Sequence, residues 1–315
     1  MRWIIRLVAG AIVLAVMTYI GADLLLKPLN DEARQGAPGS FADLDDGKLH
    51  YRLEGPEDGP LVVLVHGFST PSFIYTQNAE ALNAAGFRTL RFDHFGRGWS
   101  ERPSVKYDAD LYDRTLIALL DHLDVQEPVG LVGLSMGGPI TAEFTARHPE
   151  RVRKLVLFVP AGLDVRGADS NAARLVQTPL IGDFMWRMFG KSILLADPTY
   201  DESAVAPGTR LRGDVTEQMQ YRGYLQSLLS TMRHYPLSDR DDIFSRAGET
   251  NVPILAIYGA KDETVLISSA ERLQELIPHA DIRVLGEGDH GLNYKMHETV
   301  DPWLVEFLAN PDQVN

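Results

Sequence analysis

Residues 129–147 read VGLVGLSMGGPITAEFTAR, and this stretch decides the fold of the 315-residue chain. It opens with an apolar run typical of a buried parallel strand and closes with a helical segment introduced by Gly138-Pro139. Between them, Gly133-Leu134-Ser135-Met136-Gly137 fits G-x-S-x-G, a sharp strand-to-helix turn that exposes a nucleophilic serine. The turn strains the backbone at Ser135, and only glycine avoids collisions two positions before and after it.

Short apolar runs alternate with amphipathic segments on both sides of this turn. Residues 41–43 and 49–53 are joined by a turn and read as an antiparallel hairpin at a sheet edge. Further strands are expected at residues 61–65, 89–92, 129–132, 155–159, 254–258 and 282–285. Helices are expected at residues 78–85, 109–123, 141–147, 268–277 and 302–308. The alternation predicts an α/β fold with a doubly wound, mostly parallel, eight-stranded sheet.

The interval between Val159 and Ile254 contains no clear buried strand. It has helical stretches rich in large apolar side chains, which we interpret as a helical cap inserted after the sixth strand, over residues 163–245. Extra helices covering a sheet edge are the alternative. Trp186 and Met185 are expected to line a hydrophobic pocket beneath the cap, unless they are ordinary core residues.

A serine hydroxyl is a weak nucleophile and needs a base, which a carboxylate orients. In a fold with this turn the chain order is serine, acid, histidine. Among the downstream histidines only His290 directly follows the last predicted strand, and Asp262 follows the strand before it. We therefore expect Ser135, Asp262 and His290 to form the catalytic set. Asp164, after an earlier strand, is the serious alternative acid, and Glu263 is a weaker one.

The sequence His66-Gly67-Phe68 follows the strand at residues 61–65. Its glycine allows a turn that aims the Phe68 amide at a developing oxyanion, together with the Met136 amide. His66 precedes the nucleophile in the chain, so we expect it to brace this loop and not to act as the base.

The N-terminus departs from the rest of the chain. Residues 7–22 carry no charge, and residues 7–26 are about as long as the apolar core of a bilayer requires. We expect residues 1–26 to be a transmembrane anchor, in contact with the membrane through residues 3–26; a cleaved signal peptide or a buried soluble helix are the alternatives. Arg2 and Arg6 favour a cytoplasmic N-terminus, which places the catalytic part on the periplasmic or extracellular side.

Residues 27–40 are polar, with two prolines and two glycines, and read as a linker. With the N-terminal segment, this linker and the cap set aside, residues 41–162 and 246–315 are expected to form an α/β core.

Composition excludes several classes of function. With 30 Lys+Arg against 43 Asp+Glu, the net charge of −13 argues against non-specific nucleic-acid binding. The chain has no cysteine, which rules out disulfides, thiolate metal sites and a cysteine nucleophile. A P-loop, a dinucleotide fingerprint and metal-binding motifs are also missing from the sequence, so we expect no cofactor and no metal.

Four motifs, which follow one another along the chain in the family's order, resemble the α/β-hydrolase superfamily over residues 41–310. They are the His66 loop, the loop Asp93-His94-Phe95-Gly96-Arg97-Gly98-Trp99-Ser100, the Ser135 turn and the Asp262/His290 pair. The loop at residues 93–100 is similar to the family's D-x-x-G-x-G-x-S loop, which in that family braces the oxyanion side and is not catalytic. The resemblance implies the α/β-hydrolase fold with a cap.

Within that family the chain resembles esterases and monoacylglycerol-lipase-like enzymes, and also hydrolases that cleave carbon–carbon bonds in ring-fission products. Haloalkane dehalogenases and epoxide hydrolases are disfavoured, because the family pattern places an aspartate where this chain has Ser135. The sequence thus predicts a serine hydrolase that cleaves apolar carboxylic esters through an acyl-enzyme. A carbon–carbon bond hydrolase with the same residues, and a non-catalytic ligand-binding scaffold, are the alternatives.

Overall fold

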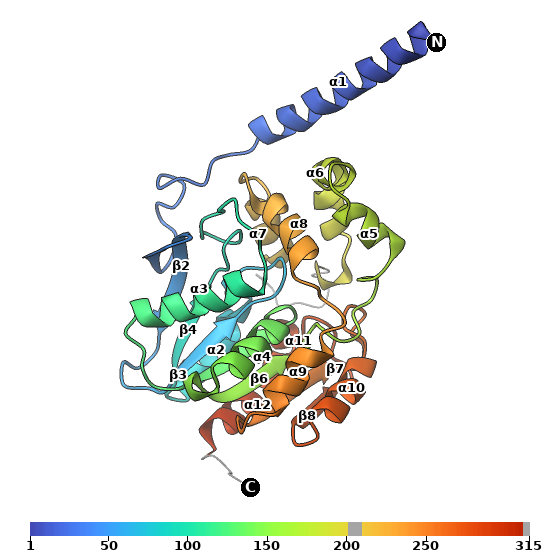
Figure 1. Ribbon diagram of the computed structural model, residues 1–315. Helices are drawn as coiled ribbons and strands as arrows, with labels where there is room; N and C mark the ends of the chain where they lie inside the picture. Colours follow the sequence, from blue (N-terminus) through green and yellow to red (C-terminus); the bar gives the residue numbers. More distant parts are fainter. Residues whose placement is uncertain (201–209, 311–315) are drawn as a thin grey trace.

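The computed structural model describes residues 1–200 and 210–310 (Figure 1). Its centre is one eight-stranded sheet with the strand order β1-β2-β4-β3-β5-β6-β7-β8. The strands are β1 (Ser40–Leu44), β2 (Gly47–Glu54), β3 (Leu61–Val65), β4 (Arg88–Phe92), β5 (Val129–Leu134), β6 (Val152–Phe158), β7 (Ile254–Gly259) and β8 (Asp281–Leu285). The β1–β2 and β2–β4 pairs are antiparallel and all other pairs are parallel. The predicted doubly wound, mostly parallel α/β sheet is therefore confirmed.

The central strands are apolar throughout because helices cover both faces of the sheet. Along β3, Val63 and Val65 belong to one core cluster, and Val62 and Leu64 belong to the cluster on the opposite face. The first face is covered by α3 (Ala109–His122), α4 (Gly137–Arg147), α9 (Asp241–Gly248) and α10 (Ser268–Leu276). The second is covered by α2 (Thr76–Ala84), α11 (Leu292–Lys295) and α12 (His297–Ala309).

Between β6 and β7 the described residues form helices and no strand of the sheet. These are α5 (Asn171–Gln177), α6 (Ile181–Leu194), α7 (Leu211–Gln218) and α8 (Tyr224–His234), followed by α9. Helices α5 to α8 lie over one end of the sheet (Figure 1), whereas α9 packs on α4. Helix α8 is tied to the loops below it, since the Tyr224 hydroxyl donates to the Ser69 carbonyl over 2.7 Å.

Helix α1 (Arg2–Leu24) projects from the rest of the molecule, and none of its residues is buried (Figure 1). The segment after it runs back along the protein to β1. Lys27 pairs with the α7–α8 connection, donating its amide to the Gln220 carbonyl and accepting from the Arg222 amide, each over 2.8 Å. The Arg34 side chain is largely buried and donates to the Trp99 carbonyl over 3.0 Å. Residues 27–40 are thus fixed to the domain at several points.

One helix boundary differs from expectation. Helix α12 begins at His297, not at residue 302, and contains Pro302 in its interior. A proline is expected at the first turn of a helix because it lacks an amide hydrogen. Here burial of Val300, Leu304 and Leu308 stabilises the longer helix despite the missing hydrogen bond.

Candidate active site

The turn between β5 and α4 places Ser135 at the carboxyl end of the central strand. Ser135 has φ +53°, a left-handed conformation that is unfavourable for a residue with a side chain. A Cβ on Gly133 would collide with the Gly137 carbonyl and the Thr141 hydroxyl, and one on Gly137 would collide with the Val65 carbonyl. Both glycines are therefore required by close backbone approach, which holds the serine in its strained position.

The structure brings Ser135, His290 and Asp262 together in one hydrogen-bonded chain. His290 Nε2 lies 3.0 Å from Ser135 Oγ, and His290 Nδ1 lies 2.8 Å from Asp262 Oδ2. The other Asp262 oxygen, Oδ1, accepts from the amides of Thr264 and Val265 over 2.7 and 2.9 Å. The carboxylate is thus fixed by the backbone on one side and orients the imidazole on the other.

The two alternative acids lie elsewhere. Asp164 is exposed and accepts a hydrogen bond from the Ser268 hydroxyl. Glu263 is also exposed and pairs with Arg166, with 3.6 Å between Oε2 and Nη1. Neither carboxylate contacts His290, so the geometry favours Asp262 as its partner.

The charge state of His290 depends on two opposing effects. Burial lowers the pKa of the imidazole, whereas the charge and hydrogen bond of Asp262, together with the charges of Asp197 and Asp289, raise it. The net effect is a pKa above the ordinary value of 6.5. The imidazolium that forms when His290 takes a proton is stabilised in the same way. A general base needs this stabilisation of its protonated form in order to accept the proton of a serine hydroxyl.

The raised pKa predicts the pH dependence of turnover. Protonated His290 has no lone pair for the Ser135 proton, so kcat/KM should fall as the pH decreases through the pKa of His290, with a midpoint above 6.5. A pH–rate profile of the free enzyme measures this limb. A profile that stays flat down to pH 5 contradicts His290 as the base.

Two backbone amides near the reacting serine have no acceptor among the described residues. Gly67 lies against Ser135, because a Cβ at Gly67 would stand 3.2 Å from the serine Cβ. Within the part of the chain that the structure describes, the amides of Phe68 and Met136 donate no hydrogen bond. They are therefore available to bind an oxyanion formed on a carbonyl that Ser135 attacks.

His66 is fully buried and does not contact the serine. Its Nε2 accepts from the His94 amide and its Nδ1 donates to the Gly67 carbonyl, each over 2.9 Å. Burial lowers the pKa of His66 to about 4, so the ring stays neutral. The prediction that His66 braces the loop is confirmed by these contacts.

The loop at residues 93–100 packs against the loop at residues 66–68 and stabilises it. Asp93 is buried; it accepts from the amide and hydroxyl of Ser72 and from the Trp99 amide, and it pairs with His50. The buried Arg97 guanidinium donates to the Phe68 carbonyl over 2.9 Å and to Thr231 of α8 over 2.9 Å. The family resemblance implied a bracing loop, but not that Arg97 joins the loop at residues 66–68 to α8.

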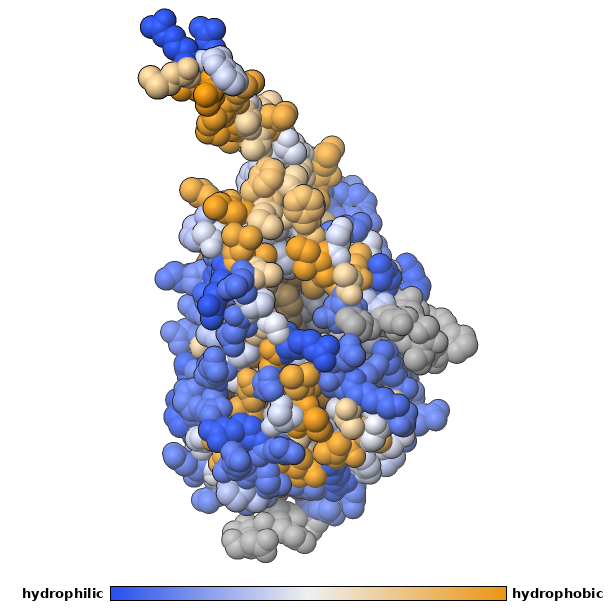
Figure 2. Space-filling model, turned by 90° about the vertical axis from the view of Figure 1, so that its right-hand side faces the viewer, coloured by the Kyte–Doolittle hydropathy of each residue, from blue (hydrophilic) through white to orange (hydrophobic). Residues whose placement is uncertain are grey.

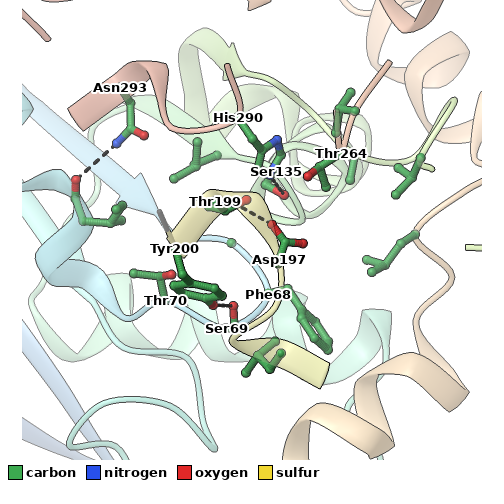
Figure 3. Close-up of a pocket in the computed structure, with 18 of the residues that line it drawn as sticks. Phe68, Ser69, Thr70, Ser135, Asp197, Thr199, Tyr200, Thr264, His290 and Asn293 are labelled. Carbon is green, nitrogen blue, oxygen red and sulfur yellow. Dashed lines mark hydrogen bonds between the residues drawn. The ribbon is translucent and has the colours of Figure 1, made fainter. Parts of the chain in front are cut away.

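A cavity of about 260 Å³ opens at Ser135 and His290 (Figure 3), and Trp186, Ile193 and Leu194 of α6 line part of it. Apolar side chains line most of it, among them Trp186, whose indole donates to the Leu225 carbonyl over 2.8 Å. Met185, which was expected beside it, is not among the described lining residues. The described lining contains no lysine or arginine.

Asp197 is a lining residue that sequence reasoning missed. Figure 3 shows it below Ser135 and His290, with one carboxylate oxygen accepting from the Thr199 amide over 2.8 Å. Its charge contributes to the raised pKa of His290. No motif marked it, since only the folding of the cap brings residue 197 over the strand ends. Among the described residues, no group of three or more His, Asp or Glu side chains forms a metal site.

A family model of the alpha/beta hydrolase fold matches residues 60–295. The chain belongs to the α/β-hydrolase family. This α/β-hydrolase is 29% identical over 266 residues to a putative non-heme chloroperoxidase of Synechocystis sp., covering 79% of this chain and 91% of the relative. It is 28% identical over 283 residues to a 2-hydroxy-6-oxononadienedioate/2-hydroxy-6-oxononatrienedioate hydrolase of Paraburkholderia xenovorans, covering 84% and 91%.

Among solved structures, the α/β-hydrolase is similar to a meta-cleavage product hydrolase from Pseudomonas fluorescens IP01. The TM-score is 0.65 at 26% identity, with 86% of this chain and 97% of the other covered. The family and these relatives identify the chain as a hydrolase.

Proposed function

We propose that this α/β-hydrolase is a membrane-anchored serine hydrolase of neutral carboxylic esters with an apolar acyl or alkyl part. The observation that carries the proposal is the Ser135–His290–Asp262 chain at the mouth of an apolar cavity. Serine, base and orienting acid lie at hydrogen-bonding distances, and the amides of Phe68 and Met136 have no acceptor among the described residues.

The geometry supports an acyl-enzyme reaction. His290 Nε2 takes the Ser135 proton as Oγ bonds to the ester carbonyl carbon, and the amides of Phe68 and Met136 bind the resulting oxyanion, each contributing about 3 kcal/mol. The intermediate expels the alcohol, which receives the proton from His290. Water, deprotonated by His290, then attacks the acyl carbon, and collapse of the second intermediate returns the proton to Ser135 and releases the acid.

The charge of the cavity favours an ester over the carbon–carbon alternative. The substrates named for the dienedioate hydrolases carry two carboxylates. The described lining of this cavity has no cationic side chain to pair with them and has the Asp197 carboxylate instead. A substrate carboxylate placed roughly 7 Å from Asp197 would be repelled by about 2 kcal/mol at an effective dielectric constant near 20. A neutral substrate is therefore preferred.

Matched esters test this preference. We expect kcat/KM for p-nitrophenyl hexanoate to exceed that for p-nitrophenyl hydrogen adipate, which ends in a free carboxylate, by about 30-fold, the equivalent of 2 kcal/mol. Asp197→Asn should bring the ratio of the two values toward one. Faster turnover of a dienedioate than of the neutral ester would instead favour the carbon–carbon hydrolase and overturn the ester assignment.

The N-terminal helix supports the anchored form. By length and composition α1 is able to cross a membrane, and none of its residues is buried against the protein. We propose that residues 1–26 remain as the anchor, that residues 163–245 act as the cap over the core, and that Arg2 and Arg6 keep the N-terminus cytoplasmic with the catalytic part outside the cytoplasm.

A further inference from the structure

Helices α5 and α6 and the turn between them expose a group of large apolar side chains. Leu180 is 85% exposed and Phe189 is 55% exposed, and the other members of this group are Leu175, Ile181 and Ile193. Scattered apolar residues are normal on a protein surface, but a contiguous set marks an interaction site. In Figure 2 the apolar surface of α1 continues onto the top of the domain that carries these helices.

Leu180 is held outward by the backbone. It has φ +66°, and the Ile181 amide donates to the Pro179 carbonyl over 2.9 Å, which closes a tight γ-turn around it. The Leu180 amide donates in turn to the Asp183 carboxylate over 2.8 Å. The strained turn therefore holds the Leu180 side chain in solvent, where a partner outside the chain can contact it.

The last turns of α1 are fixed to the same helix. The Asp23 carboxylate pairs with Arg187 of α6 and, over 3.2 Å, with Arg222 before α8. The Arg187 guanidinium also lies 4.7 Å from the ring centre of Tyr19. A membrane that holds α1 therefore has its surface at the level of α6, with Tyr19 at the interface where aromatic residues are favoured.

The charge at this junction suits a phospholipid surface. A groove of about 620 Å³ runs between the end of α1, the loop at residues 102–107 and α8. Its lining includes Arg102, Arg187 and Arg222, but Asp23 is the one carboxylate among the described lining residues. This excess of positive charge contrasts with the net charge of −13 for the chain and complements lipid phosphates.

We infer that the α5–α6 face docks on the bilayer that α1 spans, and that the cavity receives its substrate from the lipid phase. Helix α6 links the two, since Ile193 is exposed on this face and, with Trp186, also lines the cavity. An ester with a long apolar chain thereby reaches Ser135 without crossing water. The route of the substrate rests on the proposed ester hydrolysis, whereas the docking of the face does not.

The test uses the absence of cysteine from the chain, which gives each single-cysteine variant one labelling site. The full chain with Phe189→Cys, labelled with an environment-sensitive fluorophore, is reconstituted in phosphatidylcholine/phosphatidylglycerol vesicles. We expect a blue-shifted emission that brominated acyl chains quench. Val284→Cys on β8, 48% exposed and distant from the cap, is the matched control and should keep its aqueous emission.

Each other result overturns the docking. If flotation shows that the protein is bound to the vesicles but the label at residue 189 keeps the emission spectrum it has in water, α1 inserts without bringing α6 to the lipid. A blue shift that brominated lipid does not quench, but that dilution of the protein in the vesicles reverses, shows instead a contact between two copies of the chain.

Activity measurements test entry of the substrate from the lipid phase separately from ester hydrolysis itself. The double variant Ile181→Glu/Phe189→Glu should hydrolyse a soluble short-chain ester at the wild-type rate, which also checks its folding, and lose about 10-fold or more on a long-chain ester embedded in vesicles. Equal activity on the embedded ester overturns lipid-phase entry. Hydrolysis of neither ester by the wild type overturns the proposed function, while the fluorescence result still decides the docking.

Discussion

Replacement of Ser135 by alanine is expected to lower kcat for ester hydrolysis by about 10⁴- to 10⁶-fold. The hydroxyl lies 3.0 Å from His290 Nε2, and no other described serine is hydrogen-bonded to that nitrogen. Without Oγ no acyl-enzyme forms, and only the catalysis expected from oxyanion binding by the proposed Phe68 and Met136 amides remains. Steady-state kinetics and labelling by a fluorophosphonate probe both measure the loss.

Ser268→Ala is the matched control, because Ser268 is exposed, bonds to Asp164 and lies outside the cavity. It should label and turn over like the wild type. If the wild type does not react with the probe, the serine is not activated, and the chain is a ligand-binding scaffold. Labelling that persists in the alanine variant places the nucleophile elsewhere.

Asp262→Asn is expected to lower kcat by about 10⁴-fold. The amides of Thr264 and Val265 hold Asp262 Oδ1, so an asparagine at this position keeps its oxygen there and turns its NH₂ group toward His290. That group donates to Nδ1 and leaves the ring proton on Nε2, where it faces Ser135. The imidazole then has no lone pair for the serine proton, and its charged form loses the stabilising carboxylate.

Asp164→Asn is the comparison, and we expect it to change kcat less than about threefold, because Asp164 bonds to Ser268 and not to His290. Kinetics of both variants, with fluorophosphonate labelling rates as a second measure, decide between the acids. A large loss for Asp164→Asn with little change for Asp262→Asn would move the assignment to Asp164.

The parts of the fold and site that sequence predicts are those set by local pattern. Continuous apolar runs identified the central strands because these strands are buried on both faces, and the glycines around Ser135 marked a turn that no other residue fits. Asp262 and His290 were found because each directly follows a strand. The carboxyl ends of parallel strands meet at one edge of the sheet, so these positions were expected to converge.

The features that sequence did not predict depend on contacts between distant segments. Asp197 reaches the cavity only through the path of the helical segment between β6 and β7, and Arg97 joins Phe68 to Thr231 across three separate parts of the chain. The start of α12 was misplaced because tertiary burial of Leu304 and Leu308 outweighed the local preference of Pro302. None of these contacts leaves a periodic or compositional signal.

The contacts of α1 with α6 also restrict the access of a protease to the end of α1. A signal peptidase needs an extended, accessible chain, and exposed flexible segments are the usual sites of cleavage. In the folded protein the chain is helical up to Leu24, Asp23 is bound to Arg187, and Lys27 is hydrogen-bonded to Gln220. A peptidase that cuts near residue 22 would therefore have to act before α6 and α8 have folded, because these contacts protect the end of α1 in the folded protein.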